Sequence, residues 1–165
     1  MGFASARAAV VYTGAARSVV GAWKERGLRR AGDLAAELVT ARVPQPAADV
    51  ITYIPADPDR LLRRGHHPAE RLARLLARAW DLDAVELLGR TEQARARRRQ
   101  TELSRDERIG NARRAYVGLA RPPATVVLVD DVYTTGATAA AGATALRRAG
   151  AVRVEVVTFA RTVRV

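Results

Sequence analysis

The sequence predicts an α/β domain with a mostly parallel central sheet flanked by helices. Three observations predict it: an apolar strand at residues 125–129, a helical stretch at 135–149 closed by Gly150, and a second apolar strand at 152–159. A strand–helix–strand unit of this kind places its two strands parallel in one sheet and its helix over one face. The 165 residues suffice for one complete core but not for two, so we expect a single domain over residues 1–165.

Two amphipathic helices and a buried strand are expected in the N-terminal part. Apolar residues recur at helical spacing over residues 15–23, before Gly27, and again over residues 31–39. Residues 49–55 have the apolar run of a buried strand. A turn-rich stretch then leads to Pro68, which suits the first position of a helix, and the helix that follows carries on one face Leu72, Leu75, Leu76 and Trp80.

The middle of the chain is predicted to be less regular. Residues 84–88 fit a short strand, whereas residues 89–101 are polar and strongly basic, which indicates an exposed loop. Ser104, with Glu107 three residues later, has the pattern of a helix N-terminus. Residues 115–117 fit another short strand.

Composition limits the chemistry available to this chain. It has no Cys, which excludes disulfides, thiolate zinc sites and cysteine nucleophiles. We see no run of eighteen apolar residues and no secretory signal, so we expect a cytoplasmic protein without a membrane segment. The net charge of +11 favours phosphate-rich partners. Because Lys24 is the only Lys, an Arg-rich compositional bias explains this charge equally well.

The segment 130–138 carries the clearest chemical signal, with the sequence Asp-Asp-Val-Tyr-Thr-Thr-Gly-Ala-Thr. Backbone N–H groups at a turn and at a helix start attract anions, and Thr hydroxyls add further donors. A glycine in such a turn lets the backbone approach a ligand closely. We therefore predict a phosphate-binding loop made of Thr134, Thr135, Gly136, Ala137 and Thr138.

The two acids before this loop suggest a second half of the same ligand. Ionised Asp130 and Asp131 only accept hydrogen bonds, so they suit ribose hydroxyls and not phosphate. A ligand with a phosphate and a diol fits both halves, and ribose 5-phosphate is such a group. The alternatives are a buried strand that merely ends at polar residues, or an ATPase aspartate, although no G-x-x-x-x-G-K-[ST] or G-x-G-x-x-G motif is present.

Residues 127–138, Val-Leu-Val-Asp-Asp-Val-Tyr-Thr-Thr-Gly-Ala-Thr, resemble the phosphoribosyl-pyrophosphate signature of the type I phosphoribosyltransferases. The resemblance covers nearly the whole chain and implies a type I phosphoribosyltransferase-like fold. Other positions follow the order seen in the ComF branch, which is associated with competence: Tyr12-Thr13-Gly14, Lys24, Ile54-Pro55, Arg64-Gly65, Ala69-Glu70, Gln100, Leu103, Glu107-Arg108, Asn111 and Tyr116.

The chain departs from this family pattern in two places. Family members often carry an N-terminal Cys-rich zinc ribbon, and this chain has no Cys, so either the module is missing or the chain is a degenerate member. The usual Arg-Gly-Phe-Asn-Gln segment is here Arg64-Gly65-His66-His67-Pro68, without the amides. We expect His66 and His67 to be turn or cap residues, because adjacent His lack the i, i+4 spacing of a helical metal site.

The resemblance implies that a nitrogen nucleophile displaces diphosphate from phosphoribosyl pyrophosphate. Asp130 and Asp131 would orient the ribose, the 134–138 loop would hold the 5-phosphate, and Mg2+ would be bound through the substrate and not directly by the protein. Whether the chain is an active enzyme is left open by the sequence. The acceptor cannot be read either, since the only candidate aromatic surfaces are Tyr116, Tyr133 and Phe159.

Four cationic residues are further candidates for the diphosphate side of the site. Residues 56–60 would form the diphosphate loop, with Arg60 and Arg64 as anion contacts, and a plain surface turn is the alternative. Arg95 lies where the resemblance places a loop that closes over the reaction centre, although a solvated charge run has the same composition. Lys24 could reach a phosphate, or could be an ordinary helix-surface ammonium.

A rival function of a different class is a non-catalytic nucleic-acid-binding accessory of DNA uptake or repair. The basic stretch 95–99 would then bind single- or double-stranded DNA weakly, without sequence preference and with strong salt dependence. A homodimer is compatible with either function.

Overall fold

A fully parallel five-stranded sheet forms the centre of the structure, a computed structural model that describes residues 2–92 and 115–163. Every neighbouring pair of its strands runs parallel, which confirms the predicted sheet. The strand order is β1-β7-β6-β2-β3, where the strands are β1 (Ser5–Val11), β2 (Val50–Tyr53), β3 (Asp83–Ala84), β6 (Thr125–Tyr133) and β7 (Arg153–Arg161).

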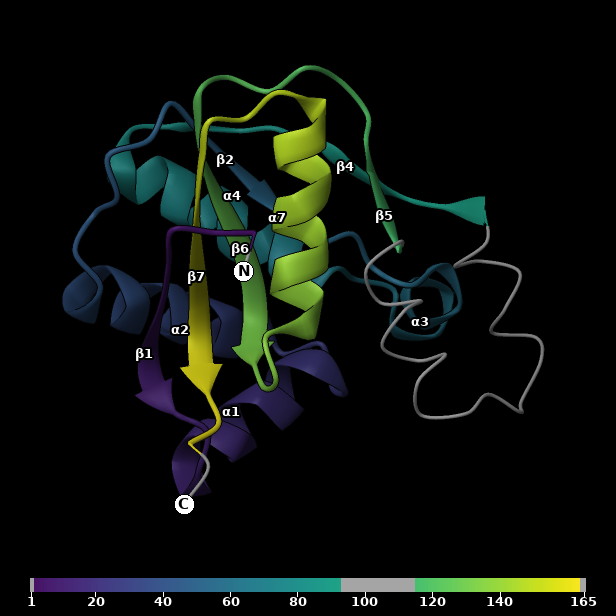
Figure 1. Cartoon of the computed structure of the whole chain (residues 1–165). Helices are drawn as coiled ribbons and strands as arrows, with labels where there is room; N and C mark the ends of the chain where they lie inside the picture. The colour runs from purple at the N-terminus through teal and green to yellow at the C-terminus, as the bar shows by residue number, and fades with distance from the viewer. Residues whose placement is uncertain (1, 93–114, 164–165) are drawn as a thin grey trace.

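Helices cover both faces of this sheet. The helix α7 (Ala137–Ala149) packs on one face, and α1 (Gly14–Lys24), α2 (Arg29–Arg42) and α4 (Pro68–Trp80) pack on the other (Figure 1). Alternate residues of β6 point to opposite faces, as strand geometry requires: Val126 and Leu128 face α7, and Val127 and Val129 face the other three helices. The core is therefore two apolar layers separated by the sheet.

The helix α4 follows the sequence prediction closely. Pro68 is its first residue, and His67 stands at the N-cap position, with its Nδ1 3.3 Å from the Glu70 N. Leu72 and Leu76 have no exposed surface, because they lie between α4 and the sheet. Burying a leucine side chain contributes about 1.5–3 kcal/mol to the free energy of unfolding, so this stripe anchors the segment that follows the candidate diphosphate turn.

A second, two-stranded sheet lies beside α7. The strands β4 (Leu88–Arg90) and β5 (Tyr116–Gly118) pair antiparallel, with Leu88 opposite Gly118. The prediction of one strand at 84–88 is therefore wrong, because residues 83–84 join the main sheet and residues 88–90 form a separate one. The rest of the predicted basic loop, residues 93–101, and the predicted helix from Ser104 lie outside the described residues.

Two elements of the structure are absent from the sequence prediction. The strand β1 was missed because only its last two residues, Val10 and Val11, are strong strand formers; it is extended because β7 pairs with it from Ser5 to Val11. The helix α3 (Pro58–Arg64) replaces the predicted turn. Asp57 caps it by accepting the Arg60 N–H, a signal that the Asp-Pro sequence carried.

Pairing with β7 also extends β6 beyond its predicted end. The strand continues to Tyr133, which pairs with Arg161, so Asp130 and Asp131 lie within the strand instead of after it. The helix α7 begins at Ala137, two residues later than predicted. In the described part of the chain, no helix is both long and apolar enough to cross a membrane.

Candidate ligand-binding site

The boundary between β6 and β2 is the place where this sheet can hold a ligand. The chain leaves β6 through α7 toward β7, whereas it leaves β2 through α4 toward β3, in the opposite direction. Ligands bind at such a switch point, outside the carboxyl ends of the strands. The last bond between the two strands is donated by Ile54 N to Val129 O, at 3.0 Å. Beyond this bond β6 pairs only with β7, so the backbone of Asp130 has no neighbouring strand on the β2 side.

A cavity of about 440 Å³ lies at this point. Its volume falls within the roughly 300–1,000 Å³ that is typical of small-molecule sites. The turn after β2, the helix α3, the start of α4 and the 130–138 segment contribute to its walls. Sequence-predicted site residues that line it are Lys24, Arg60, Arg64, Asp130, Asp131, Thr134 and Thr138.

The other predicted residues are placed differently. Thr135, Gly136 and Ala137 belong to the same loop but are not part of the cavity wall. Arg95 lies outside the described residues. His66 and His67, which the sequence predicted only as turn or cap residues, also line the cavity, as do Arg90 and, from the predicted diphosphate loop, Ala56.

Asp131 forms an ion pair with Lys24, the last residue of α1. Lys24 Nζ lies 2.6 Å from Asp131 Oδ2, and the two side chains are 25% and 14% exposed. Lys24 is therefore neither a free surface ammonium nor, in this arrangement, a free phosphate contact. It holds the Asp131 carboxylate at the cavity that both residues line.

Asp130 points to the opposite face of β6 and lies in a very different environment. Its Oδ1 accepts the N–H of Asp131 at 2.9 Å. Burial, followed by the charge of the neighbouring Asp131, raises the pKa of Asp130 to about 8. This raised pKa favours the protonated form of Asp130, whereas the sequence analysis expected both acids to be ionised.

Arg90 is a largely buried cation, which contradicts its predicted place in an exposed loop. Its side chain is 16% exposed, with Nη2 3.9 Å from Asp57 Oδ2. Its guanidinium carbon lies 5.5 Å from the centre of the Tyr116 ring, within the range of a cation–π contact. The strand β4 carries Arg90 there because its pairing with β5 places Arg90 opposite Tyr116.

His66 and His67 have opposite hydrogen-bond environments. His66 Nε2 and Nδ1 lie 2.7 and 2.9 Å from the carbonyl oxygens of Trp23 and Arg64. His67 Nε2 accepts the Ala56 N–H at 2.8 Å, and its Nδ1 faces the Glu70 N–H at 3.3 Å. Burial lowers the pKa of His67. The predicted cap role is confirmed for His67, and the ring also forms part of the cavity wall.

The loop after β6 is held by contacts within the loop and with the residue after β7. Thr162 donates its N–H to the Tyr133 carbonyl at 2.9 Å and its hydroxyl to the Thr134 carbonyl at 3.2 Å. Thr135 Oγ1 accepts the Ala137 N–H at 3.3 Å. Thr134 and Thr138 thereby reach the cavity from a fixed backbone.

Gly136 is required by this loop, and we expect Gly136→Ala to destabilise the fold. Its φ of +76° is left-handed, where a side chain costs about 1–2 kcal/mol, and an added Cβ would overlap the Tyr133 hydroxyl. Urea unfolding measures the loss. The matched control is Gly21→Ala in α1, which meets nothing within 4 Å and should be neutral or stabilising. Equal stability of both variants would contradict this account of the loop.

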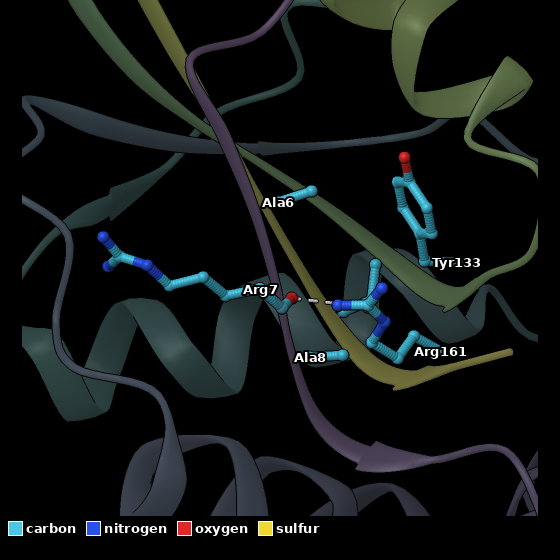
Figure 2. A pocket seen from close by; sticks show the side chains of 6 residues that line it. Ala6, Arg7, Ala8, Tyr133 and Arg161 are labelled. Atoms are coloured by element: carbon cyan, nitrogen blue, oxygen red, sulfur yellow. Dashed lines mark hydrogen bonds between the residues drawn. The ribbon is translucent and has the colours of Figure 1, made fainter. Parts of the chain in front are cut away.

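The predicted aromatic surfaces separate into three environments. Phe159 is 1% exposed and lies in the core, so it cannot recognise an acceptor, which corrects the prediction. Tyr133 packs edge-to-face against Phe3 and stands beside a second cavity of about 80 Å³, which is also lined by Arg161 (Figure 2). That volume is too small for a nucleotide. Of these three, Tyr116 alone lines the large cavity.

Comparisons with known proteins add the fold. No protein-family model matches the sequence, and neither does any curated protein. Glutamine phosphoribosylpyrophosphate amidotransferase from B. subtilis, solved with ADP and GMP, matches with a TM-score of 0.50 and 24% identity over 77% of this chain. The match spans about a quarter, 24%, of the amidotransferase chain.

Two further solved structures resemble the chain. The protein TT1426 from Thermus thermophilus has a TM-score of 0.42 and 22% identity, over 79% of this chain and 72% of that one. Purine phosphoribosyltransferase from Pyrococcus horikoshii has a TM-score of 0.41 and 20% identity, over 86% and 80%. With the parallel sheet and its flanking helices, the likeness to the amidotransferase shows that the chain has the type I phosphoribosyltransferase fold.

Proposed function

We propose that the chain binds phosphoribosyl pyrophosphate together with magnesium and transfers the phosphoribosyl group to a nitrogen nucleophile. The observation that carries the proposal is the cavity at the β6–β2 switch point, where the Asp130–Asp131 pair and Thr134 lie in one wall. The same cavity is lined by several cations, which suits a ligand with one diol and two phosphate-rich ends.

The acids would recognise the sugar. Asp131, paired with Lys24, would offer acceptor oxygens to a ribose hydroxyl. The raised pKa of Asp130 favours its protonated form, which can both donate and accept, so the two carboxyls together fit a pair of hydroxyls. Thr134 and Thr138 would donate their hydroxyls to the 5-phosphate, with the first N–H groups of α7 as additional donors.

Cationic side chains would stabilise the departing diphosphate. In the reaction the bond between the anomeric carbon and a diphosphate oxygen breaks, diphosphate leaves with the electron pair, and a carbon–nitrogen bond forms. Arg60 and Arg64 line the cavity on the α3 side, where the leaving group would gain negative charge. Arg64 Nη2 lies 2.5 Å from Glu25 Oε1, so the Arg64 guanidinium would have to contact both Glu25 and the ligand.

Magnesium would enter this site as a ligand-bound ion. The diphosphate oxygens would supply most of its coordination. When bound, the ion would neutralise charge on those oxygens. We also propose that the chain has a competence-associated role, because its residue order resembles that of the ComF branch.

Phosphoribosyl pyrophosphate with magnesium is expected to stabilise the fold. At a hundredfold excess over the dissociation constant the gain is about 2.7 kcal/mol, read as a rise in melting temperature. Ribose 5-phosphate with magnesium should give a smaller rise, because it lacks the diphosphate, and sodium sulfate at equal ionic strength controls for general anion effects. If the melting temperature with millimolar phosphoribosyl pyrophosphate equals the melting temperature with sulfate, the proposal is wrong.

A further inference from the structure

The amide of Ala56 is already occupied by a titratable ring of this chain. Ala56 lies in the turn after β2 and lines the cavity. Its N–H is accepted by His67 Nε2 at 2.8 Å. The Tyr53 ring packs edge-to-face against the His67 ring, with 5.2 Å between the two ring centroids. Both His67 and Ala56 belong to the cavity wall, so an anion that reaches this wall meets the pair together.

Both nitrogens of the His67 ring face N–H donors, which only a bare nitrogen can accept. A neutral imidazole has one bare nitrogen, and the shorter contact, to Ala56, is the one it satisfies. An imidazolium has none. Protonation of His67 would therefore break the Ala56 contact and turn two donors toward each other, unless an acceptor oxygen lies between them.

We propose that His67 couples anion binding to proton uptake: it accepts the Ala56 amide while the cavity is empty, and takes a proton from the buffer when a phosphate or diphosphate group binds. The oxygen of the anion then accepts both the Ala56 N–H and the new ring N–H. This inference rests on the proposed function, because it assigns a contact to the diphosphate end of the same ligand.

The surroundings of the ring favour such a change of charge. Burial lowers the pKa of His67, so the ring is neutral in the empty site. Among the described residues the charged and titratable groups that face it are Glu70 on α4, Asp131 on β6, the adjacent His66, and Tyr53 on β2. Glu70 and Asp131 favour the cation and His66 opposes it. A bound anion would act in the same direction as Glu70 and Asp131, and would raise the pKa of the His67 ring.

The test is calorimetry of the full chain at about pH 7.5 in two buffers of different ionisation enthalpy, with magnesium and phosphoribosyl pyrophosphate or diphosphate as the probe. The unaltered chain is expected to take up close to one more proton per ligand than His67→Asn, because Asn can cap α4 but cannot titrate. Comparing the two chains removes the protons that the ligand itself exchanges. His66→Asn is the matched control and should keep the uptake.

A second measurement uses the unaltered chain alone. The chain has two His, so proton NMR can follow both rings with pH, with and without diphosphate and magnesium. The proposal expects one ring, which His67→Asn removes, to titrate at higher pH when the ligand is present. Ligand binding with equal proton uptake in both chains, or with unchanged ring titrations, overturns the proposal and leaves the proposed function standing. If neither ligand binds, both are wrong.

Discussion

Replacing Asp130 by Asn is expected to stabilise the fold increasingly as the pH rises toward 8, while weakening binding of the ribose ligand. The pKa of Asp130 is about 8 in the folded chain and near 3.8 when the side chain is in water. Between these values the folded state binds more protons than the unfolded state, so stability falls as pH rises, by at most ~1.4 kcal/mol per pH unit. Asn keeps the shape and removes that loss.

Urea unfolding at pH 4, 6 and 8 would measure this effect. The variant and the parent should differ little near pH 4, where the carboxyl has only begun to ionise in the unfolded state, and should diverge steadily toward pH 8. Asp131→Asn is the comparison at the neighbouring position. It should show no such gain, because Asp131 is paired with Lys24 and loses that ion pair on substitution. A stability difference that does not change with pH would contradict the raised pKa of Asp130.

The same Asp131→Asn variant is expected to lose roughly ten- to a hundredfold in affinity for ribose 5-phosphate, which corresponds to the ~1.5–3 kcal/mol of a charge-assisted hydrogen bond. Asn replaces one of the two acceptor oxygens by an NH2 donor. It also removes the charge that pairs with the Lys24 ammonium. The 134–138 loop is unchanged, so phosphate and sulfate should bind at least as well as before. Calorimetry with ribose 5-phosphate and sulfate separates the two halves of the site.

A charge-matched control for this experiment is Asp81→Asn. Asp81 ends α4 away from the large cavity and has a φ of +53°, a conformation that Asn tolerates well. The substitution changes the net charge by the same amount, and its affinity for ribose 5-phosphate should equal that of the parent. If Asp131→Asn also binds like the parent, the diol assignment is wrong and the acid pair has a structural role.

Much of the fold could be predicted because the patterns involved are local. Apolar residues at helical spacing located α1, α2 and α4, and the strand–helix–strand pattern of residues 125–159 predicted a parallel sheet. The order of chemical groups in residues 130–138 pointed to the segment that lines the cavity. Each of these signals depends on neighbours in the chain, so it survives without knowledge of the tertiary structure.

The rest depended on groups that are distant in the sequence. Only pairing with β7 makes Ser5–Val11 a strand, and only packing brings Lys24 to Asp131, Arg90 to Tyr116 and His67 to Ala56. The raised pKa of Asp130 follows mainly from its burial in the folded chain. Sequence alone thus predicted which segment would hold a phosphate and a diol. The tertiary structure decided the charge of each group there, because desolvation and ion pairing are set by what packs around a side chain.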